Sequence, residues 1–427
     1  MASPARGHYS LSDWLNYLKT IHGMPIEMSL ERIREVQAKL KLYEFNFPVI
    51  TVGGTNGKGS TCAILDAILR AAGYKTGIFT SPHLLRYNER IKIDGQEARD
   101  HELCAAFAEI DDARQFTSLT YFEFSALAAL LIFRRQQCQV VVLEVGLGGR
   151  LDATNVFDSD CAVITSIGID HVHYLGNTRE DIGYEKAGIF RPHKPAICAE
   201  PDPPQRLVSY ASSIHARLLR INEVFGFKTN NVSWDFWHHR APRYALPYPT
   251  LKGQFQLYNA SAALAALSEL SSQLPVTLTD IRRGLVEVSW PGRFHVMPGR
   301  PAIIFDVAHN PHAATALAAT LQLAPPAQKN YAVCGLLKDK DMVGILAALL
   351  PQIDAWLFTN IDSPRAASAT ELKALLETFD VATPAQTFDD PVAAFESARQ
   401  LATENDRIIV FGSFHTVAPV LAFIQGT

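Results

Sequence analysis

The segment that decides the fold is FPVITVGGTNGKGSTCAILDAILRAAG, residues 47–73. A run rich in β-branched residues comes first, a glycine-rich loop follows, and a helical pattern closes at Gly73. In such a loop the backbone N–H groups turn toward an anion, and the helix N-terminus adds partial positive charge. Lys58 supplies a further positive charge for phosphate groups. The segment therefore predicts a nucleotide-phosphate site between a strand and a helix.

The loop departs from the usual phosphate-loop pattern G-x-x-x-x-G-K-[ST]. Only three residues separate Gly53 from Gly57, and Gly59 stands between Lys58 and Ser60. The alternative is a glycine-rich turn that carries a solvated lysine. We favour the phosphate site because strand, loop, lysine, hydroxyl and helix occur in the required order.

On both sides of this loop, short apolar runs alternate with helical patterns. The runs at 75–81, 140–146 and 161–170 are almost continuously apolar, which is typical of parallel strands buried on both faces. Residues 225–255 are aromatic and broken by proline, so we expect a small antiparallel flap there. A second alternation of strands and helices begins near 293–300, and this spacing predicts a separate α/β domain.

The expected fold class is therefore α/β. An N-terminal P-loop-type ATPase domain (1–295) would have a mostly parallel sheet and a small β-rich flap. A C-terminal Rossmann-like α/β domain (296–427) would follow.

Composition excludes several function classes. The 427 residues include 39 Lys and Arg against 43 Asp and Glu, a net charge of −4, which argues against nucleic-acid binding by bulk positive charge. Apolar residues make up 48%, so the chain is not of the disordered class. The six cysteines form no CxxC pair, which indicates a reducing compartment and neither a zinc knuckle nor a redox dithiol. We expect no signal peptide, no membrane span and a cytoplasmic location.

Polar residues at strand ends are the next candidates for chemistry. Glu144 lies at the C-terminal end of the strand pattern VVVLEV, where α/β sheets bind ligands, and a carboxylate near a nucleotide is a candidate Mg²⁺ ligand. The alternative is an acid in a surface loop. His171 ends the next strand pattern and could share an ion with Glu144, although Mg²⁺ prefers oxygen. The glycines that follow Glu144 do not match a dinucleotide fingerprint, because Leu151 occupies the third glycine position.

Two further positions carry weaker signals. Ser81 lies in a loop after the strand pattern KTGIFTS, and Lys186 lies late in a helical pattern, where a lysine is usually solvated. In the second domain, Asp306, His309 and Ser413 follow strand patterns. Polar residues at several strand ends of one sheet favour a ligand-binding edge.

Eight motifs occur in one order: VGGTNGKGST, SPHL, EVGLGGRLDATN, DH-x-x-x-LG, EKAGI, PGRF, DVAHNP and GSFHTV. Together they resemble the folylpolyglutamate synthases, a family of Mur-ligase-like ATP-dependent amide ligases. The resemblance runs from about residue 11 to 422. The segments at 30–33 and 118–123 are similar to the bacterial bifunctional subgroup, which combines dihydrofolate synthase and folylpolyglutamate synthase. That subgroup usually has DLG before LER, whereas this chain has Glu27-Met28-Ser29.

The resemblance implies a role for each matching position. ATP would be bound by Gly57, Lys58, Gly59, Ser60, Asn259, Arg293 and Asp306. Ser81 and Glu144 would hold one Mg²⁺ and His171 a second, and a carbamylated Lys186 would face the metal. The pterin would contact Glu27, Met28, Ser29, Leu30, Thr120, Tyr121, Phe122, Glu123, Leu151, Asp152 and Ala153. L-glutamate would lie near Arg90, His309 and Ser413. Lys58, Lys186 and His171 would be the catalytic residues.

The implied reaction is ligation of L-glutamate to 7,8-dihydropteroate and to folylglutamates through an acyl phosphate. The substrates would be small molecules, and we expect a monomer. One alternative is a ligase for another acid, such as a UDP-linked cell-wall precursor, but only about 45 residues precede the phosphate loop. A second is a folylpolyglutamate synthase without dihydrofolate synthase activity. A third, from another class, is a nucleotide-binding regulator without catalysis.

Overall fold

The computed structural model describes residues 8–24, 26–43, 45–381 and 383–426. It contains two compact units. Unit 1 comprises residues 1–250 and 257–288, and unit 2 comprises residues 251–256 and 289–427. This division lies a few residues before the expected boundary at 295/296, and a short segment that includes the start of helix α9 also belongs to unit 2.

Unit 1 is built around an eight-stranded sheet of order β4-β3-β2-β5-β1-β6-β7-β8. Its strands are β1 (Val49–Gly53), β2 (Thr76–Phe79), β3 (Ile91–Ile93), β4 (Gln96–Glu97), β5 (Val140–Glu144), β6 (Cys161–Ile164), β7 (Pro195–Cys198) and β8 (Arg217–Arg220). In this order the strands from β2 to β8 pair in parallel with their neighbours. β3 pairs antiparallel with both β2 and β4. The phosphate loop follows β1, so it lies in the middle of the sheet's carboxyl edge.

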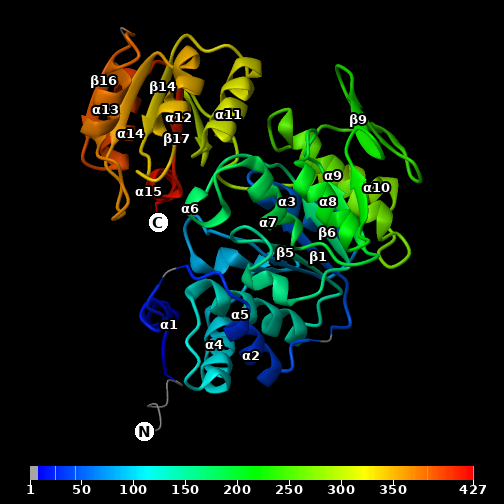
Figure 1. The fold of residues 1–427 in the computed structure, drawn as a ribbon. Helices are drawn as coiled ribbons and strands as arrows, with labels where there is room; N and C mark the ends of the chain where they lie inside the picture. Colours follow the sequence, from blue (N-terminus) through cyan, green and yellow to red (C-terminus); the bar gives the residue numbers. More distant parts are fainter. Residues whose placement is uncertain (1–7, 25, 44, 382, 427) are drawn as a thin grey trace. The chain divides into compact units, whose positions relative to one another are not determined.

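Helices cover both faces of this sheet. They are α1 (Leu11–Leu18), α2 (Glu31–Lys39), α3 (Lys58–Ala71), α4 (Asp100–Arg114), α5 (Tyr121–Arg135), α6 (Val172–Leu175), α7 (Arg179–Ala187), α8 (Gln205–Ser213), α9 (Phe255–Glu269) and α10 (Leu278–Glu287). In Figure 1, α2, α4 and α5 lie on one side of β1 and β5, and α3 lies on the other.

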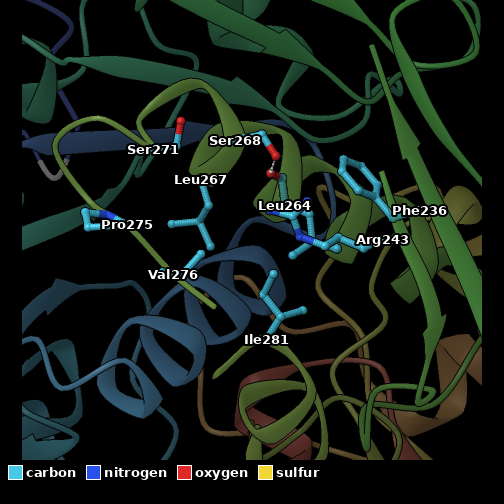
Figure 2. Close-up of a pocket in the computed structure, with 9 residues that line it drawn as sticks. All are labelled: Phe236, Arg243, Leu264, Leu267, Ser268, Ser271, Pro275, Val276 and Ile281. Atoms are coloured by element: carbon cyan, nitrogen blue, oxygen red, sulfur yellow. Dashed lines mark hydrogen bonds between the residues drawn. The ribbon is translucent and has the colours of Figure 1, made fainter. Parts of the chain in front are cut away.

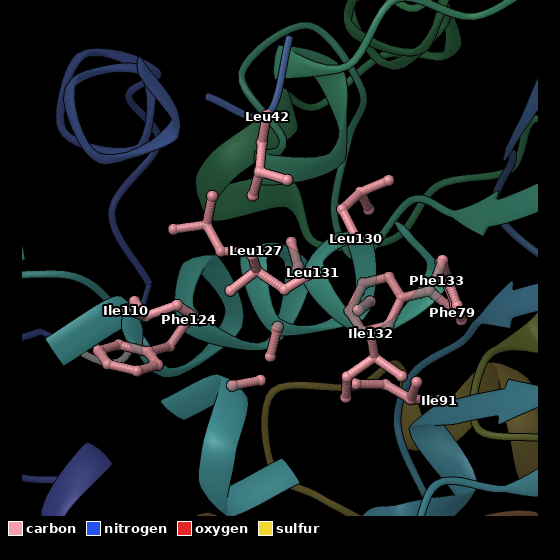
Figure 3. Packing of buried hydrophobic residues seen from close by; sticks show 14 of the residues in the cluster. Leu42, Phe79, Ile91, Ile110, Phe124, Leu127, Leu130, Leu131, Ile132 and Phe133 are labelled. Atoms are coloured by element: carbon pink, nitrogen blue, oxygen red, sulfur yellow. The ribbon is translucent and has the colours of Figure 1, made fainter. Parts of the chain in front are cut away.

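The core on the α5 side explains why that helix is apolar on nearly every face. Figure 3 shows Phe124, Leu127 and Leu131 of α5 packed among buried side chains from other elements, such as Leu42 and Ile110. The helix begins at a capping box, in which Thr120 accepts a hydrogen bond from the N–H of Glu123 and the Glu123 carboxylate accepts one from the N–H of Thr120. The start of α5, which carries Tyr121 and Phe122, is thereby fixed.

Residues 225–246 form the expected antiparallel flap. Its strands are β9 (Phe225–Thr229), β10 (Trp234–His238) and β11 (Arg243–Leu246), in the order β11-β10-β9. The alternating burial along β10 shows that Trp234, Phe236 and His238 face inward.

Unit 2 has a six-stranded sheet of order β12-β13-β17-β14-β15-β16, parallel except for β12. The strands are β12 (His295–Met297), β13 (Ala302–Asp306), β14 (Asn330–Cys334), β15 (Ala355–Thr359), β16 (Ala385–Phe388) and β17 (Arg407–Phe411). The helices are α11 (Pro311–Leu323), α12 (Met342–Leu349), α13 (Ala369–Glu377), α14 (Pro391–Leu401) and α15 (Phe414–Gln425). The α/β class and the two sheets agree with the expected fold.

Candidate functional site

The phosphate loop connects β1 to α3 and has a conformation that requires glycine. Gly54 has φ +144° and Gly57 has φ +88°, a region that favours residues without a Cβ. A Cβ at Gly57 would also overlap Oδ1 of Asn259, which is buried on α9. Asn259, one of the residues expected to bind ATP, lies in unit 1 beside the loop. The loop and Asn259 therefore share one compact unit.

The strand expected over 161–170 ends early because its continuation holds this loop. After Ile164, the Thr165 hydroxyl donates to the Asn56 carbonyl at 2.6 Å, and the Ser166 carbonyl accepts from the N–H of Thr55 at 2.7 Å. Lys58 Nζ donates to the carbonyls of Gly54 at 3.0 Å and Thr55 at 3.2 Å. The lysine ammonium is thereby held over the loop that would cradle a phosphate.

Glu144 and Ser81 come together at the ends of neighbouring strands. β2 and β5 pair in parallel, so both residues lie at the same sheet edge. The Ser81 N–H donates to Glu144 Oε2 at 2.9 Å, and Glu144 is only 3% exposed. A buried carboxylate next to a hydroxyl-bearing residue is the oxygen-rich donor set that Mg²⁺ prefers. The residues present thus fit a divalent cation at this edge.

Lys186 is buried on α7, where the sequence alone favoured a solvated side chain. Burial, followed by the positive charge of Lys58, lowers the pKa of Lys186 to about 7, while Asp170 and Asp152 act in the opposite direction. Two lysines within electrostatic reach of each other repel, so the site disfavours a cation at Lys186. A carbamate there would replace this repulsion with attraction to Lys58 or to a metal ion.

His171 lies before α6 in a left-handed conformation, with φ +53°, and is exposed. Its N–H donates to the Asp170 carboxylate at 2.8 Å. In the described part of the chain, three ligand atoms of His, Cys, Asp or Glu converge within 4.8 Å only at His238, His239 and Glu269. A metal site at Glu144 and His171 would therefore depend on other donors, such as the Ser81 hydroxyl and a modified Lys186.

The glycine-rich loop after β5 brings two of the expected pterin segments to this edge. A Cβ at Gly146 would come within 2.5 Å of the Phe122 ring, and one at Gly148 would lie 3.3 Å from Met28 Cε. A Cβ at Gly149 would lie 2.9 Å from the carbonyl of Lys186. Met28, Phe122 and Lys186 are thus gathered around one loop, although about 160 residues separate the first from the last.

The other expected pterin residues have mostly structural contacts. Buried Asp152 accepts from the N–H of Leu147 at 2.8 Å and from the Thr154 hydroxyl at 2.6 Å, and its burial raises its pKa. Ser29 Oγ accepts from the Glu31 N–H at 3.2 Å. Leu30, Thr120 and Ala153 are buried, while Tyr121 and Leu151 are half-buried.

Arg90 has no carboxylate partner among the residues that the structure describes. Its Nε donates to His83 Nδ1 at 2.8 Å, and its guanidinium lies 5.5 Å from the Tyr87 ring and 5.4 Å from the Tyr121 ring. The neighbouring Glu89 accepts three backbone N–H groups instead. An arginine with unused Nη donors is suited to a substrate carboxylate.

In unit 2, the expected residues gather at the carboxyl edge of β13 and β17, which pair in parallel. Asp306 is 7% exposed and accepts from the N–H groups of Phe294 and Ala308, both at 2.8 Å. Burial raises the pKa of Asp306, and the charge of Arg293 opposes that shift. Ser413 caps α15, and His309 Nδ1 lies 2.7 Å from the Val307 carbonyl, so it carries the proton.

The structure also shows two features that the sequence reading missed, both beside the flap. One is the cluster at Glu269, whose carboxylate pairs with Arg217; His238 Nε2 lies 3.5 Å from its other oxygen. His238 Nδ1 accepts from the N–H of Arg240, so Nε2 carries the proton in the neutral ring, and at 3.5 Å it makes no hydrogen bond with Glu269. Since Glu269 also lies within ion-pair distance of Arg240, the cluster is held by two arginine–glutamate pairs.

The second feature is a cavity of about 130 Å³ between the flap and helices α9 and α10 (Figure 2). It is lined by Phe236, Arg243, Leu264, Leu267, Ser268, Ser271, Pro275, Val276 and Ile281. None of the expected site residues lines it.

Comparison with known proteins identifies the family. The Mur ligase middle domain matches residues 52–267, and the Mur ligase glutamate ligase domain matches residues 292–414. A dihydrofolate synthase/folylpolyglutamate synthase of Escherichia coli (strain K12) is 44% identical over 97% of this chain and 96% of its own length. The chain belongs to the Mur ligase family. Within it, the chain groups with the dihydrofolate synthase/folylpolyglutamate synthases, as the eight motifs predicted.

Solved structures extend this agreement to the fold. The Escherichia coli FolC protein in complex with DHPP and ADP has a TM-score of 0.94 and 43% identity, covering 99% of both chains. A bifunctional folylpolyglutamate synthase/dihydrofolate synthase with Mn, AMPPNP and L-glutamate bound has a TM-score of 0.91 and 45% identity, covering 98% of this chain and 99% of its own. These findings confirm the expected fold class and the assignment as an ATP-dependent ligase that joins glutamate to folates. No described helix is long and apolar enough to cross a membrane.

Proposed function

We propose that this Mur ligase family member adds L-glutamate both to 7,8-dihydropteroate and to the γ-carboxyl of folylglutamates. The observation that carries the proposal is the gathering of Met28, Phe122 and Lys186 around the loop that follows Glu144. An acceptor bound between the first two residues would present its carboxylate near the phosphate loop. One relative solved with DHPP and ADP, and another solved with AMPPNP and L-glutamate, support an acceptor, an adenine nucleotide and L-glutamate as ligands.

The reaction has two steps. The acceptor carboxylate attacks the γ-phosphorus of ATP, which forms an acyl phosphate and releases ADP. The α-amine of L-glutamate then attacks the acyl carbon, which releases phosphate and forms the amide. The first step brings two anions together, and Lys58 with the loop N–H groups is placed to offset their charge.

We assign binding roles to the residues at the two sheet edges. In unit 1, Gly57, Lys58, Gly59, Ser60 and Asn259 would hold the nucleotide, and in unit 2 Arg293 and Asp306 would do so. Arg90, His309 and Ser413 would bind L-glutamate, since Arg90 offers guanidinium donors without a carboxylate partner in the described part of the chain. That the protein is monomeric and cytoplasmic stays a prediction.

In this proposal the site binds two Mg²⁺ ions. Ser81 and Glu144 would hold one, and His171 would hold the second, facing a carbamate on Lys186. Bound Mg²⁺ would lower the repulsion between the acceptor carboxylate and the phosphates. Lys186 favours the modification because burial lowers its pKa and so raises the share of the neutral amine, which is the form that reacts with CO₂.

Product analysis tests the function. Incubation with ATP, Mg²⁺, L-glutamate and either 7,8-dihydropteroate or tetrahydrofolate should give a product one glutamyl unit heavier in each case. Addition to tetrahydrofolate alone would leave a folylpolyglutamate synthase. ATP binding without glutamyl product from either acceptor would indicate another acid substrate or a regulator.

Replacement of Glu144 by glutamine tests the metal assignment. An amide oxygen is a weaker Mg²⁺ ligand than a carboxylate, so half-maximal activity should require at least about tenfold more Mg²⁺. Titration of the initial rate against Mg²⁺ concentration measures the shift. Glu35→Gln is the control, because that side chain is 52% exposed on α2. An unchanged Mg²⁺ titration in a folded Glu144→Gln variant would remove Glu144 from the metal ligands.

A further inference from the structure

Arg32, on the first turn of α2, connects two segments that lie about 90 residues apart in the sequence. Its Nη1 pairs with Glu27 Oε1, and its Nη2 donates to Glu123 Oε1 at 3.2 Å and more weakly to the Glu27 carbonyl at 3.4 Å. The Arg32 side chain is 16% exposed and that of Glu123 only 3%. Charge-assisted hydrogen bonds in such a shielded place are stronger than those on the surface. Arg32 therefore holds the segment before α2 against the start of α5.

A second bridge joins the same two segments. His22 Nε2 lies 2.8 Å from Glu27 Oε2, and His22 Nδ1 lies 3.0 Å from Ser118 Oγ. Three of the four oxygens of Glu27 and Glu123 accept hydrogen bonds, one of them from the N–H of Thr120 at 2.7 Å, and the fourth, Glu27 Oε2, is the one near His22. Both carboxylates thus contact protein partners, which limits the hydrogen bonds that either can accept directly from a ligand.

The bridged segments carry the two side chains that line the loop after β5. Met28 follows Glu27 directly and lies beside Gly148, and Phe122 precedes Glu123 and lies against Gly146. A change in the distance between the segments would change the distance between these two side chains. The width of the acceptor site between Met28 and Phe122 consequently depends on the Glu27–Arg32–Glu123 bridge.

We propose that Arg32 is a positioning residue for the acceptor, which sets the spacing of Met28 and Phe122 around the pterin ring without touching it. This inference rests on the proposed function, because it takes the acceptor of that reaction as its ligand. It assigns Glu27 and Glu123 to support of the site and leaves the direct contacts to their neighbours.

Replacement of Arg32 by glutamine should raise the KM for 7,8-dihydropteroate about tenfold, because a neutral amide cannot pair with two carboxylates at once. The KM for ATP should change less than twofold, since the bridge joins the segment before α2 to the start of α5, whereas the phosphate loop is held by Thr165 and Ser166. A purely structural role would move both constants, or lower the amount of folded enzyme. Arg32→Lys should give an intermediate KM for 7,8-dihydropteroate, because an ammonium keeps the positive charge but lacks the planar guanidinium that can bond to two carboxylates.

Arg34→Gln is the matched control, because Arg34 is exposed on the same helix. If a thermal unfolding curve shows that Arg32→Gln is not folded, Glu27→Gln tests the same bridge while keeping the pair between Arg32 and Glu123. That variant should raise the KM for 7,8-dihydropteroate at least threefold. An unchanged KM for 7,8-dihydropteroate in a folded Arg32→Gln or Glu27→Gln variant would overturn this inference but not the proposed function. A wild-type enzyme that makes no product from 7,8-dihydropteroate would overturn the proposed function, and the inference with it.

Discussion

Lys58→Ala is expected to lower kcat for glutamyl addition by about a hundredfold or more while the protein stays folded. The lysine ammonium is held over the phosphate loop by the carbonyls of Gly54 and Thr55, where it would meet the charge that develops on the transferred phosphoryl group. Loss of one preorganised group of this kind typically costs two to three orders of magnitude, about 10² to 10³. The measurement is phosphate release at saturating ATP and Mg²⁺, together with a thermal unfolding curve.

The control for this variant is Lys194→Ala, because Lys194 is 48% exposed and pairs with Asp160 outside the site. It should keep the wild-type kcat. A folded Lys58→Ala enzyme with a kcat close to that of the wild type would show that the loop does not carry the phosphoryl transfer.

Lys186→Ala is expected to be as damaging for a different reason. If Lys186 is carbamylated, its replacement removes a negative charge that faces Lys58 and the metal, and a cavity replaces the buried chain. We expect a loss of at least about a hundredfold in kcat. Formate or acetate, which could enter that cavity, should restore part of the rate.

Chemical rescue of Lys186→Ala distinguishes a required carbamate from a required amine. Methylamine would restore activity if the amine itself were required, and the carboxylates would not. Mass analysis of the intact wild-type protein in bicarbonate buffer should show an added mass of about 44 Da, which is that of CO₂. Rescue by methylamine alone would contradict the modification.

Much of the fold follows from local sequence. The phosphate loop is recognisable because strand, glycines, lysine and helix are contiguous, and the apolar runs before Glu144 and His171 mark parallel strands. The run at 161–170 was predicted too long, since Thr165 and Ser166 leave the sheet to bind the phosphate loop. Strands β7, β8 and β16 are short and resemble connecting segments, so their place depends on pairing with distant strands.

The site was less accessible to sequence reasoning than the fold. Lys186 sits in a helical pattern that ordinarily exposes a lysine, yet its side chain is buried, and the loop at Gly149 closely approaches its backbone carbonyl. Arg32 has no motif of its own, because its partners lie on segments remote from each other in the chain. Such contacts become visible only after the backbone has folded. Family resemblance identified Lys186 as a site residue, whereas the bridge at Arg32 could be recognised only from the folded structure.

The two margins of the eight-stranded sheet bear on how copies of this chain can associate. At one margin, β4 has only two residues, and at the other β8 carries Arg217 and Arg220, each paired with a glutamate. A very short or charged outer strand offers a poor template for hydrogen bonding to a strand from another molecule. Extension of this sheet between copies is therefore disfavoured at both of its margins.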